Sequence, residues 1–295
     1  MDYKYPTPQL LFKAICNAIR SKTGNSDEIP HQNIPDELDG INMIKNECTN
    51  LIEIINGNAE MFSNYITTIG SGRFYANANL TTVNLPECTS IASNAFTNCT
   101  NLTTINFPKC TTIGRSAFEG CTNLMAVYLP ECTSIDDNAF HSCNNLIIMN
   151  LPECTSIGDY AFYNCSGLIT LILRANQVVN ISSRSLGNVP ATYNEGNIYV
   201  PDNLVDSYKT ATNWSRCRIK PLSSLTAIIF NTDQIITNTN ILKGTPIENG
   251  IGYIYVPDNL VDSYKIAANW STYADQIKPR SEMPSELKEE YGFGY

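Results

Sequence analysis

The sequence is poor in charge. Charged residues make up 16% of its 295 residues, whereas a soluble domain usually has about 25%. The 19 basic residues are scattered along the chain and the net charge is −9. The chain therefore lacks the clustered Lys and Arg that phosphate binding requires, and we expect no nucleic-acid partner.

Long apolar runs are also missing. No stretch approaches the roughly 18 apolar residues of a transmembrane helix, so we expect no membrane insertion. The first six residues, MDYKYP, show neither the basic nor the apolar region of a signal peptide. Two alternatives follow: synthesis without a Sec signal, or a leader that has been removed.

Residues suited to catalysis are scarce. The sequence has two histidines, His31 and His141, and no G-x-S-x-G, P-loop or dinucleotide-binding motif. His141 lies close to Cys143, but a Cys–His nucleophile also needs an orienting partner and an oxyanion hole. No C-x-x-C pair points to a metal site. We expect no enzymatic activity, no cofactor and no bound metal.

What the sequence does have is a repeat of 22 residues. Four copies follow one another without insertion from residue 80, beginning with LTTVNLPECTSIASNAFTNCTN. Leu80, Val83 and Leu85 have the L-x-x-L-x-L spacing of a solenoid strand, and Pro86 ends that strand because it has no N–H to donate. The pair Ala95 and Phe96 fits a short helical turn on the opposite side. A unit this small buries its apolar face only by stacking on its neighbours.

The strings Pro-x-Cys-Thr-Ser-Ile, Asn-Ala-Phe and Asn-Cys-Thr-Asn-Leu resemble the BspA-type leucine-rich repeat of bacterial and some protozoal surface proteins. The resemblance is strong over residues 66–175. It implies a short parallel sheet on one face, tight turns on the other, attachment or recognition roles, and no catalytic residues. The fold class that we predict is α+β, with a leucine-rich-repeat solenoid over residues 47–167.

Eight of the eleven cysteines fall into two columns of the repeat. One column holds Cys88, Cys110, Cys132 and Cys154, and the other holds Cys99, Cys121, Cys143 and Cys165. Ile66 occupies the first column in a degenerate earlier copy, which indicates a buried, apolar position. Stacked coils lie about 4.8 Å apart, whereas a disulfide needs converging Cβ atoms about 3.8 Å apart. We predict core thiols; disulfides and a metal site are the alternatives.

A longer duplication follows the repeats. The eleven residues 199–209 recur unchanged as 255–265, and Trp214 recurs as Trp270. These matches define two units, residues 168–223 and 225–281, each expected to form strand, turn, strand, helix and strand, with Asp202 as a helix N-cap. We expect the first unit to cap the solenoid and the second to extend or re-cap it. The tryptophans and tyrosines are predicted to be core, with a carbohydrate platform as the alternative, and residues 282–295 a flexible tail.

The N-terminal segment, residues 1–46, is expected to be helical. Thr7-Pro8 fits an N-cap followed by proline at the first helical position. The stretch 18–24, together with Ile29 and Ile34-Pro35, resembles a segment of minor structural proteins of Firmicutes phages. That resemblance implies a virion or assembly module; the alternative is a helical cap on the solenoid.

Columns that vary between copies on a regular scaffold are where recognition usually occurs. These columns predict a partner-binding face on the exposed strand and turn positions, and the alternative is a merely solvated face. The candidate residues are Thr104, Met125, Tyr128, Ile148, Asn150, Ile172, His141 and Tyr160. The function that we predict is non-enzymatic recognition of a host or bacterial surface protein or glycan by an extracellular, cell-surface or virion-associated protein. The alternative is a structural or assembly protein of a prophage virion.

Overall fold

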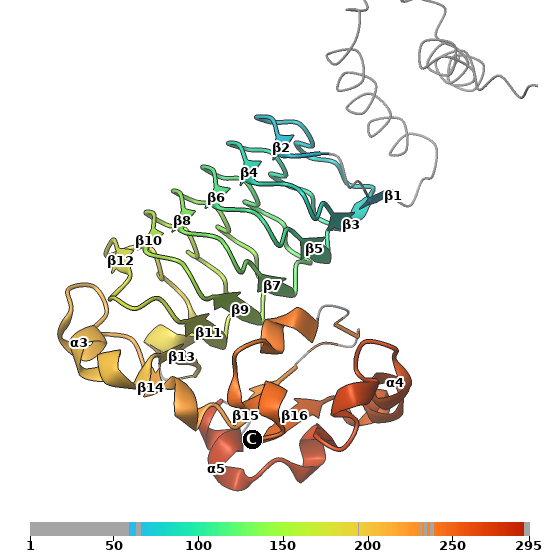
Figure 1. Cartoon of the computed structure of the whole chain (residues 1–295), viewed down its shortest axis with the longest axis vertical. Coiled ribbons are helices and arrows are strands. Elements are labelled where there is room, and N and C mark those ends of the chain that lie inside the picture. The colour runs from blue at the N-terminus through green and yellow to red at the C-terminus, as the bar shows by residue number, and fades with distance from the viewer. Residues whose placement is uncertain are drawn as a thin grey trace, which may run out of the picture.

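The chain forms a short solenoid with a smaller unit folded against it (Figure 1). The computed structural model describes residues 59–62, 66–193, 195–230, 232, 235–236 and 239–291. The expected N-terminal helices of residues 1–46, as well as Cys16 and Cys48, lie outside the described residues. None of the helices within the described ranges has the length and apolar character that a membrane crossing requires.

One side of the solenoid is an eight-stranded parallel sheet, as the repeat predicts. Its registers advance by one period, so Thr82 pairs with Thr104 and Ala126 pairs with Ile148. The order of strands in the sheet follows the chain. The strands are β1 (Ala59–Phe62), β3 (Leu80–Asn84), β5 (Thr104–Asn106), β7 (Ala126–Tyr128), β9 (Ile148–Leu151), β11 (Thr170–Leu173), β13 (Asn197–Val200) and β14 (Ile219–Pro221).

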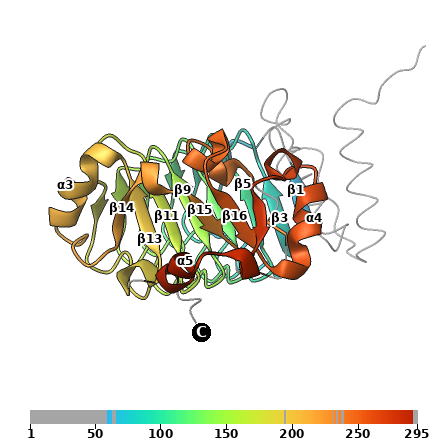
Figure 2. The same cartoon turned by 90° about the horizontal axis from the view of Figure 1, so that it is seen from below.

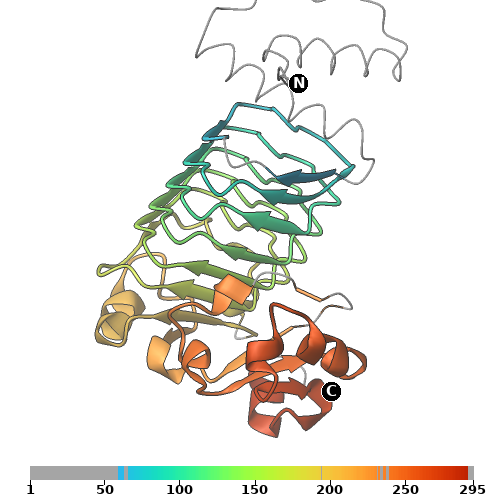
Figure 3. The same ribbon diagram turned by 45° about the vertical axis from the view of Figure 1, so that its right-hand side comes forward.

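A second parallel sheet of two-residue strands runs along another side of each coil (Figure 3). Threonines beside it add bonds between coils, because Thr111 Oγ1 donates to the Thr89 carbonyl at 3.1 Å and Thr133 Oγ1 donates to Thr111 at 3.2 Å. These strands are β2 (Thr68–Ile69), β4 (Ser90–Ile91), β6 (Thr112–Ile113), β8 (Ser134–Ile135), β10 (Ser156–Ile157) and β12 (Asn180–Ile181).

Tight turns close each coil where a helical turn was expected at Ala95 and Phe96. That expectation is wrong because the flanking Asn94 and Asn98 have left-handed φ values of 58° and 60°, which end a right-handed helix. The turn backbone instead bonds to the next coil, with Phe96 N donating to the Ala117 carbonyl at 2.7 Å. Most backbone groups of a coil therefore find their partners in neighbouring coils.

The core between the sheets is built from columns of identical side chains. Five phenylalanines, one per coil, stack with ring centroids 5.1–5.5 Å apart. All eight column cysteines are fully buried and none of them forms a disulfide, which confirms the prediction of core thiols. Within the described residues, no group of three or more His, Cys, Asp or Glu side chains is arranged to hold a metal ion.

Each thiol in the core donates to a backbone carbonyl. In the first column Cys88 Sγ lies 3.4 Å from the Ser90 oxygen. In the second column Cys121 Sγ lies 3.1 Å from the Phe96 oxygen of the preceding coil. Burial raises the pKa of the Cys88 thiol to about 11 and that of Cys110 to about 12. These thiols are therefore protonated donors and poor nucleophiles at neutral pH.

The first duplicated unit continues the stack, since β13 and β14 belong to the solenoid sheet. Its aromatics are core, as predicted: the Tyr208 hydroxyl accepts the Val179 N–H at 3.1 Å and Trp214 Nε1 donates to the Val179 oxygen at 2.8 Å. Asp202 does not cap the helix α3 (Val205–Thr210). It accepts the Ser223 N–H at 3.0 Å instead, because Asp202 itself lies in the 3-10 turn η3 (Asp202–Leu204) ahead of that helix.

The second duplicated unit leaves the stack, against the expectation that it extends or re-caps the first unit. It forms its own three-stranded sheet from β15 (Ala227–Ile229), β16 (Tyr253–Val256) and β17 (Ile277–Pro279). Figure 2 shows this sheet in front of the solenoid strands, whose outer face it covers. The other elements are α4 (Val261–Ile266) and the short 3-10 turns η5 (Thr239–Leu242), η6 (Pro246–Asn249), η7 (Asp258–Leu260) and η8 (Ser271–Tyr273).

The end of the chain is also ordered, so the expectation of a flexible tail at residues 282–295 is wrong for its described part. After η9 (Arg280–Glu282), residues Ser285–Glu290 form the helix α5. Tyr291 is 4% exposed because its hydroxyl bonds to the Tyr199 hydroxyl at 2.9 Å. We call residues 225–291 the C-terminal unit.

Candidate recognition surfaces

The outer face of the solenoid sheet was expected to be exposed, and most of it is not. Met125 is 6% exposed and Ile148, Asn150 and Ile172 are fully buried; Tyr128 is half-buried. All five lie against the C-terminal unit. The five residues do form one docking surface, but its occupant in this structure is the chain itself.

The composition of the strand face explains which strands the C-terminal unit covers; we call this unit the cover of that face. On β3 and β5 the outward residues are threonine and asparagine, and they remain half-exposed. Thr104 belongs to this open part, where Asn106 Nδ2 donates to Asn84 Oδ1 at 2.8 Å. From β7 onward the face becomes more apolar: Ala126 and Ile148 follow Thr104, and Ile172 stands in the column of Asn106. An apolar area of this size needs a cover, and the C-terminal unit supplies it.

Polar contacts hold both ends of the cover. At one end, Asn150 Nδ2 donates to the carbonyls of Ile241 at 2.9 Å and Lys243 at 3.1 Å. At the other end, Asn197 Nδ2 donates to Glu290 Oε1 at 2.8 Å, and Arg218 Nη1 donates to the Glu290 carbonyl at 3.1 Å. These contacts fix the register of the unit on the strand face.

Two of the predicted residues, His141 and Tyr160, come together on the turn side of the solenoid. The His141 ring stacks on Tyr163 with centroids 5.6 Å apart and planes 8° apart. Tyr160 meets Tyr163 edge to face at 5.2 Å. We call His141, Asp159, Tyr160, Tyr163 and Arg184 the turn-edge cluster. It lies far from the covered strand face, at the last regular copies of the repeat.

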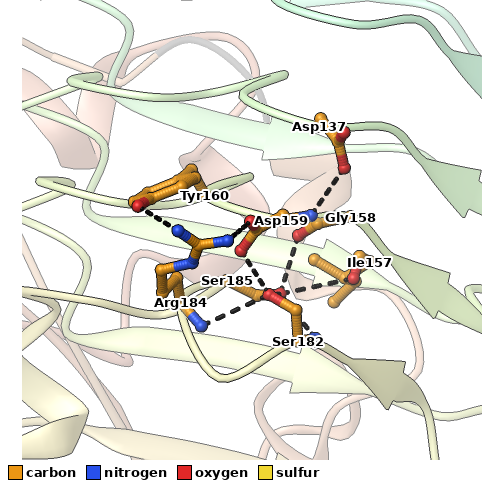
Figure 4. A network of polar contacts seen from close by, with 8 residues as sticks. All are labelled: Asp137, Ile157, Gly158, Asp159, Tyr160, Ser182, Arg184 and Ser185. Carbon is orange, nitrogen blue, oxygen red and sulfur yellow. Dashed lines mark hydrogen bonds and ion pairs between the residues drawn. The ribbon is translucent and has the colours of Figure 1, made fainter.

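Arg184 ties this cluster together (Figure 4). Its Nη1 donates to the Tyr160 hydroxyl at 2.6 Å, and its Nη2 donates to Asp159 Oδ2 at 2.5 Å. Its guanidinium carbon also lies 4.4 Å from the centroid of the Tyr160 ring. The Arg184 side chain is nevertheless 58% exposed, so charge, hydroxyl and aromatic edges are presented to solvent together.

Tyr160 stands in a conformation that tyrosine rarely adopts. Its φ is 56°, and the equivalent residues Asn94, Ser116 and Asn138 have φ values of 54–58°. Asparagine tolerates this left-handed region, whereas a bulky side chain is an outlier there. Such strain costs on the order of 1–3 kcal/mol and is retained where the surroundings hold it, often at functional sites.

His141 and Cys143 do not form the nucleophilic pair that their spacing in the sequence suggested. His141 Nδ1 lies 3.1 Å from Ser142 Oγ and 3.9 Å from Glu119 Oε1. Cys143 is fully buried, and its Sγ points inward to the Phe118 oxygen at 3.1 Å. Burial keeps the pKa of the Cys143 thiol well above its usual range.

Sequence reasoning missed Tyr163 and Arg184. Tyr163 occupies the same column as His141 and Glu119, so column variation carried a usable signal for it. Its ring needs Gly187, where a Cβ would lie 2.4 Å from Tyr163 Cδ2. Arg184 lies beyond the last regular copy, where the period of 22 no longer predicts which residue faces which.

Parallel coils with identical core columns define a leucine-rich-repeat solenoid. The family model of the BspA type leucine rich repeat region matches residues 24–88 and 67–192 in six copies. Together these matches cover more than half of the chain, and the chain belongs to the BspA-type leucine-rich repeat family. No curated protein matches the sequence.

The chain is similar to several solved bacterial structures. It shares 30% identity with a leucine-rich repeat protein from Eubacterium ventriosum over 45% of this chain and 37% of that one, with a TM-score of 0.42. It shares 24% identity with a leucine rich cell surface protein from Faecalibacterium prausnitzii, over 66% and 60% of the two chains, at a TM-score of 0.40. It shares 23% identity with the T. pallidum leucine rich repeat protein over 51% of this chain and 74% of that one, with a TM-score of 0.36.

Proposed function

We propose that this chain is a non-enzymatic binding protein that recognises a surface protein of a host or bacterium through the turn-edge cluster. The observation that carries the proposal is Tyr160, which is held in a left-handed conformation under Arg184 where other copies place asparagine or serine. Tyrosine and arginine are the residue types that most often dominate binding energy at protein interfaces. Membership of a repeat family associated with binding and adhesion supports the same function.

A protein partner is favoured over a glycan by the way the rings are used. Sugars usually stack on a free aromatic face, but one face of Tyr163 is taken by His141 and the other lies against Gly187. Tyr160 has Arg184 over its ring. What remains for a partner is ring edges, hydroxyls and the exposed guanidinium, which suit hydrogen bonding to a protein surface.

The test is a binding screen of the full chain against arrays of surface proteins and of glycans. The variant is Tyr160→Asn with Tyr163→Thr, which inserts the residues that the repeat itself carries as Asn94 and Thr97 and so preserves the fold. We expect wild-type binding to a protein, weakened roughly 30-fold or more in the variant, as for a hot spot worth about 2 kcal/mol. The control is Tyr193→Ala, because Tyr193 is 62% exposed and lies outside the cluster.

Two results would count against the proposal. Binding that survives the double substitution unchanged would remove the turn-edge cluster as the recognition site. Binding only to glycans, lost in the same variant, would keep the site and replace the partner class.

The proposal includes a location at the cell surface or on a virion, and the finer choice rests on the N-terminal segment. Its resemblance to minor structural proteins of phages favours a second candidate, a structural or assembly protein of a prophage virion. The gene neighbourhood distinguishes the two. Tail-assembly and lysis genes alongside would favour the virion role, and an isolated gene with a secretion leader would favour a surface adhesin.

A further inference from the structure

A short segment of the C-terminal unit sits on the covered strand face as a bound peptide would. The turn η5 packs on β7 and β9, and its residues Ile241 and Leu242 are fully buried. Asn150, from β9, donates its side-chain amide to two carbonyls of this segment, those of Ile241 and Lys243. Apolar side chains and backbone carbonyls together make the contact.

The fit between cover and strand face is incomplete in its polar groups. Within the described ranges, the buried side-chain atoms without a hydrogen-bond partner are Asn150 Oδ1, Arg174 Nε and Asn197 Oδ1. All three lie at this interface: Asn150 and Asn197 contact the C-terminal unit, and the Arg174 guanidinium lies against Gly244. A buried polar atom without a partner is unfavourable, so the closed arrangement is weaker than its apolar burial suggests.

The C-terminal unit is also built to be independent. Its core is continuous with the strand face, but it contains a local aromatic clamp, in which the Tyr264 hydroxyl accepts the Ile236 N–H at 2.9 Å and Trp270 Nε1 donates to the Ile236 oxygen. Its sheet shares no strand pairing with the solenoid sheet. One turn, η4 (Leu222–Ser224), precedes it after β14.

The two duplicated units differ at the position that contacts the strand face. Asn188 in the first unit and Gly244 in the second are both left-handed, with φ of 58° and 70°. Three residues before them stand Ser185 and Ile241. Ser185 Oγ donates to the Gly158 carbonyl of the preceding coil at 2.7 Å, whereas Ile241 packs on the strand face. The same position therefore bonds the first unit to the preceding coil through Ser185 and packs the second unit on the strand face through Ile241.

We propose that residues 239–243 are an internal, displaceable ligand, and that the strand face over β7 and β9 binds a short peptide segment of another protein in the same kind of turn. The partner segment carries two adjacent apolar side chains for the surface around Ile148 and Ile172. The side-chain amide of Asn150 bonds twice to the backbone of the partner segment. Nδ2 donates to a carbonyl, and Oδ1 accepts an N–H that η5 does not offer. This site is separate from the turn-edge cluster and does not depend on it.

The experiment uses a fluorescein-labelled peptide with the sequence of residues 239–247, TNILKGTPI, added to the full chain. Ile241→Asp opens the cover by burying a charge, and Gly244→Ala loosens it because alanine is strained at a φ of 70° and its methyl group displaces the Arg174 guanidinium. We expect both variants to bind the peptide about tenfold or more tightly than wild type, because the wild-type face is free in about a tenth of molecules or fewer. The control is Ile266→Asp, a residue of the same unit that is 82% exposed.

Two measurements keep the result interpretable. Hydrogen peroxide should oxidise Met125 faster in the opened variants than in wild type, because Met125 is shielded by the cover. Hydrogen exchange of the Ile236 amide reports whether the C-terminal unit stays folded. If Ile241→Asp makes this amide exchange rapidly, the unit has unfolded, and the test then rests on Gly244→Ala. Adding Asn150→Ala to the opened variant should abolish peptide binding.

The proposal is overturned by either of two results. One is equally tight peptide binding by wild type and opened variants. The other is no binding by a variant in which Met125 is exposed and the Ile236 amide is still protected.

Discussion

At the scale of single residues, the column cysteines act as hydrogen-bond donors that suit a crowded interior. A thiol is small, apolar and able to donate weakly, which fits a position stacked on copies of itself. The second-column thiols connect coils, because Cys143 Sγ reaches the Phe118 oxygen and Cys165 Sγ reaches the Phe140 oxygen, at 3.1 and 3.0 Å. Four such contacts connect neighbouring coils, and the four first-column thiols donate to carbonyls two residues away in their own coil.

The buried thiols predict a loss of stability in alkali. Burial raises the pKa of Cys88 and Cys154 to about 11 and that of Cys110 and Cys165 to about 12, from 9.0. The folded state therefore holds protons that the unfolded state releases above about pH 9. Stability from these groups is complete below that pH and is lost as the pH rises toward 11–12. Urea midpoints at a series of pH values measure this loss.

A control variant and a thiol count accompany that measurement. Cys88→Ile places in the second copy the residue that the preceding copy carries as Ile66, and it should reduce the pH dependence. Native protein should leave the eight column cysteines unmodified by a thiol reagent, and denatured, unreduced protein should expose all eleven cysteines. A denatured count well below eleven would contradict the core-thiol interpretation.

At the scale of elements, the duplication preserved an internal clamp while its surroundings changed. Tyr208 and Trp214 hold the backbone of Val179, and Tyr264 and Trp270 hold that of Ile236 in the same way. The carboxylates match as well, since Asp202 and Asp258 each accept a serine N–H at 3.0 Å. The duplicated sequence therefore forms the same local structure within the solenoid stack, in the first unit, and outside it, in the second.

This equivalence predicts that the clamps stabilise different parts of the molecule. Tyr208→Phe leaves the Val179 N–H without a partner, and Tyr264→Phe does the same for Ile236, each at a cost of about 1–3 kcal/mol. Tyr208→Phe should destabilise the solenoid, and Tyr264→Phe the C-terminal unit. Hydrogen exchange resolved by residue measures both effects. Equal loss of protection across the whole chain from either variant would show that the two parts unfold as one.

Sequence patterns predicted the elements better than their arrangement. The period of 22 placed the parallel sheet and the core columns because each copy contacts only its neighbours. The departure of the second unit was not predicted, because its identical residues 255–265 form the same local structure in both settings. The difference lies in single substitutions, such as Phe230 where the first unit has Leu173 and Ile241 where it has Ser185. Phe230 packs against Tyr264 at 6.0 Å, in the core that the unit shares with the strand face.

At the scale of the whole molecule, the predicted site falls into two parts, one on the covered strand face and one on the turn side. Met125, Tyr128, Ile148, Asn150 and Ile172 lie on one face, but their cover comes from residues about 90–110 positions later in the chain. A repeat pattern reports neighbours one period apart and carries no information on such a contact. His141 and Tyr160 were grouped by column variation alone, and the tyrosine strain and Arg184 that join them depend on the turn geometry.

The solenoid should also respond to core substitutions according to position. Phe118 stacks on both Phe96 and Phe140, at 5.1 and 5.2 Å, whereas Phe74 stacks on Phe96 alone among the described rings. In a stack with nearest-neighbour coupling, a central substitution removes two interfaces and a terminal one removes a single interface. Phe118→Ala should cost about 3–5 kcal/mol and Phe74→Ala clearly less, as measured by urea unfolding of the full chain. Equal costs at the two positions would mean that the coils do not act as coupled neighbours.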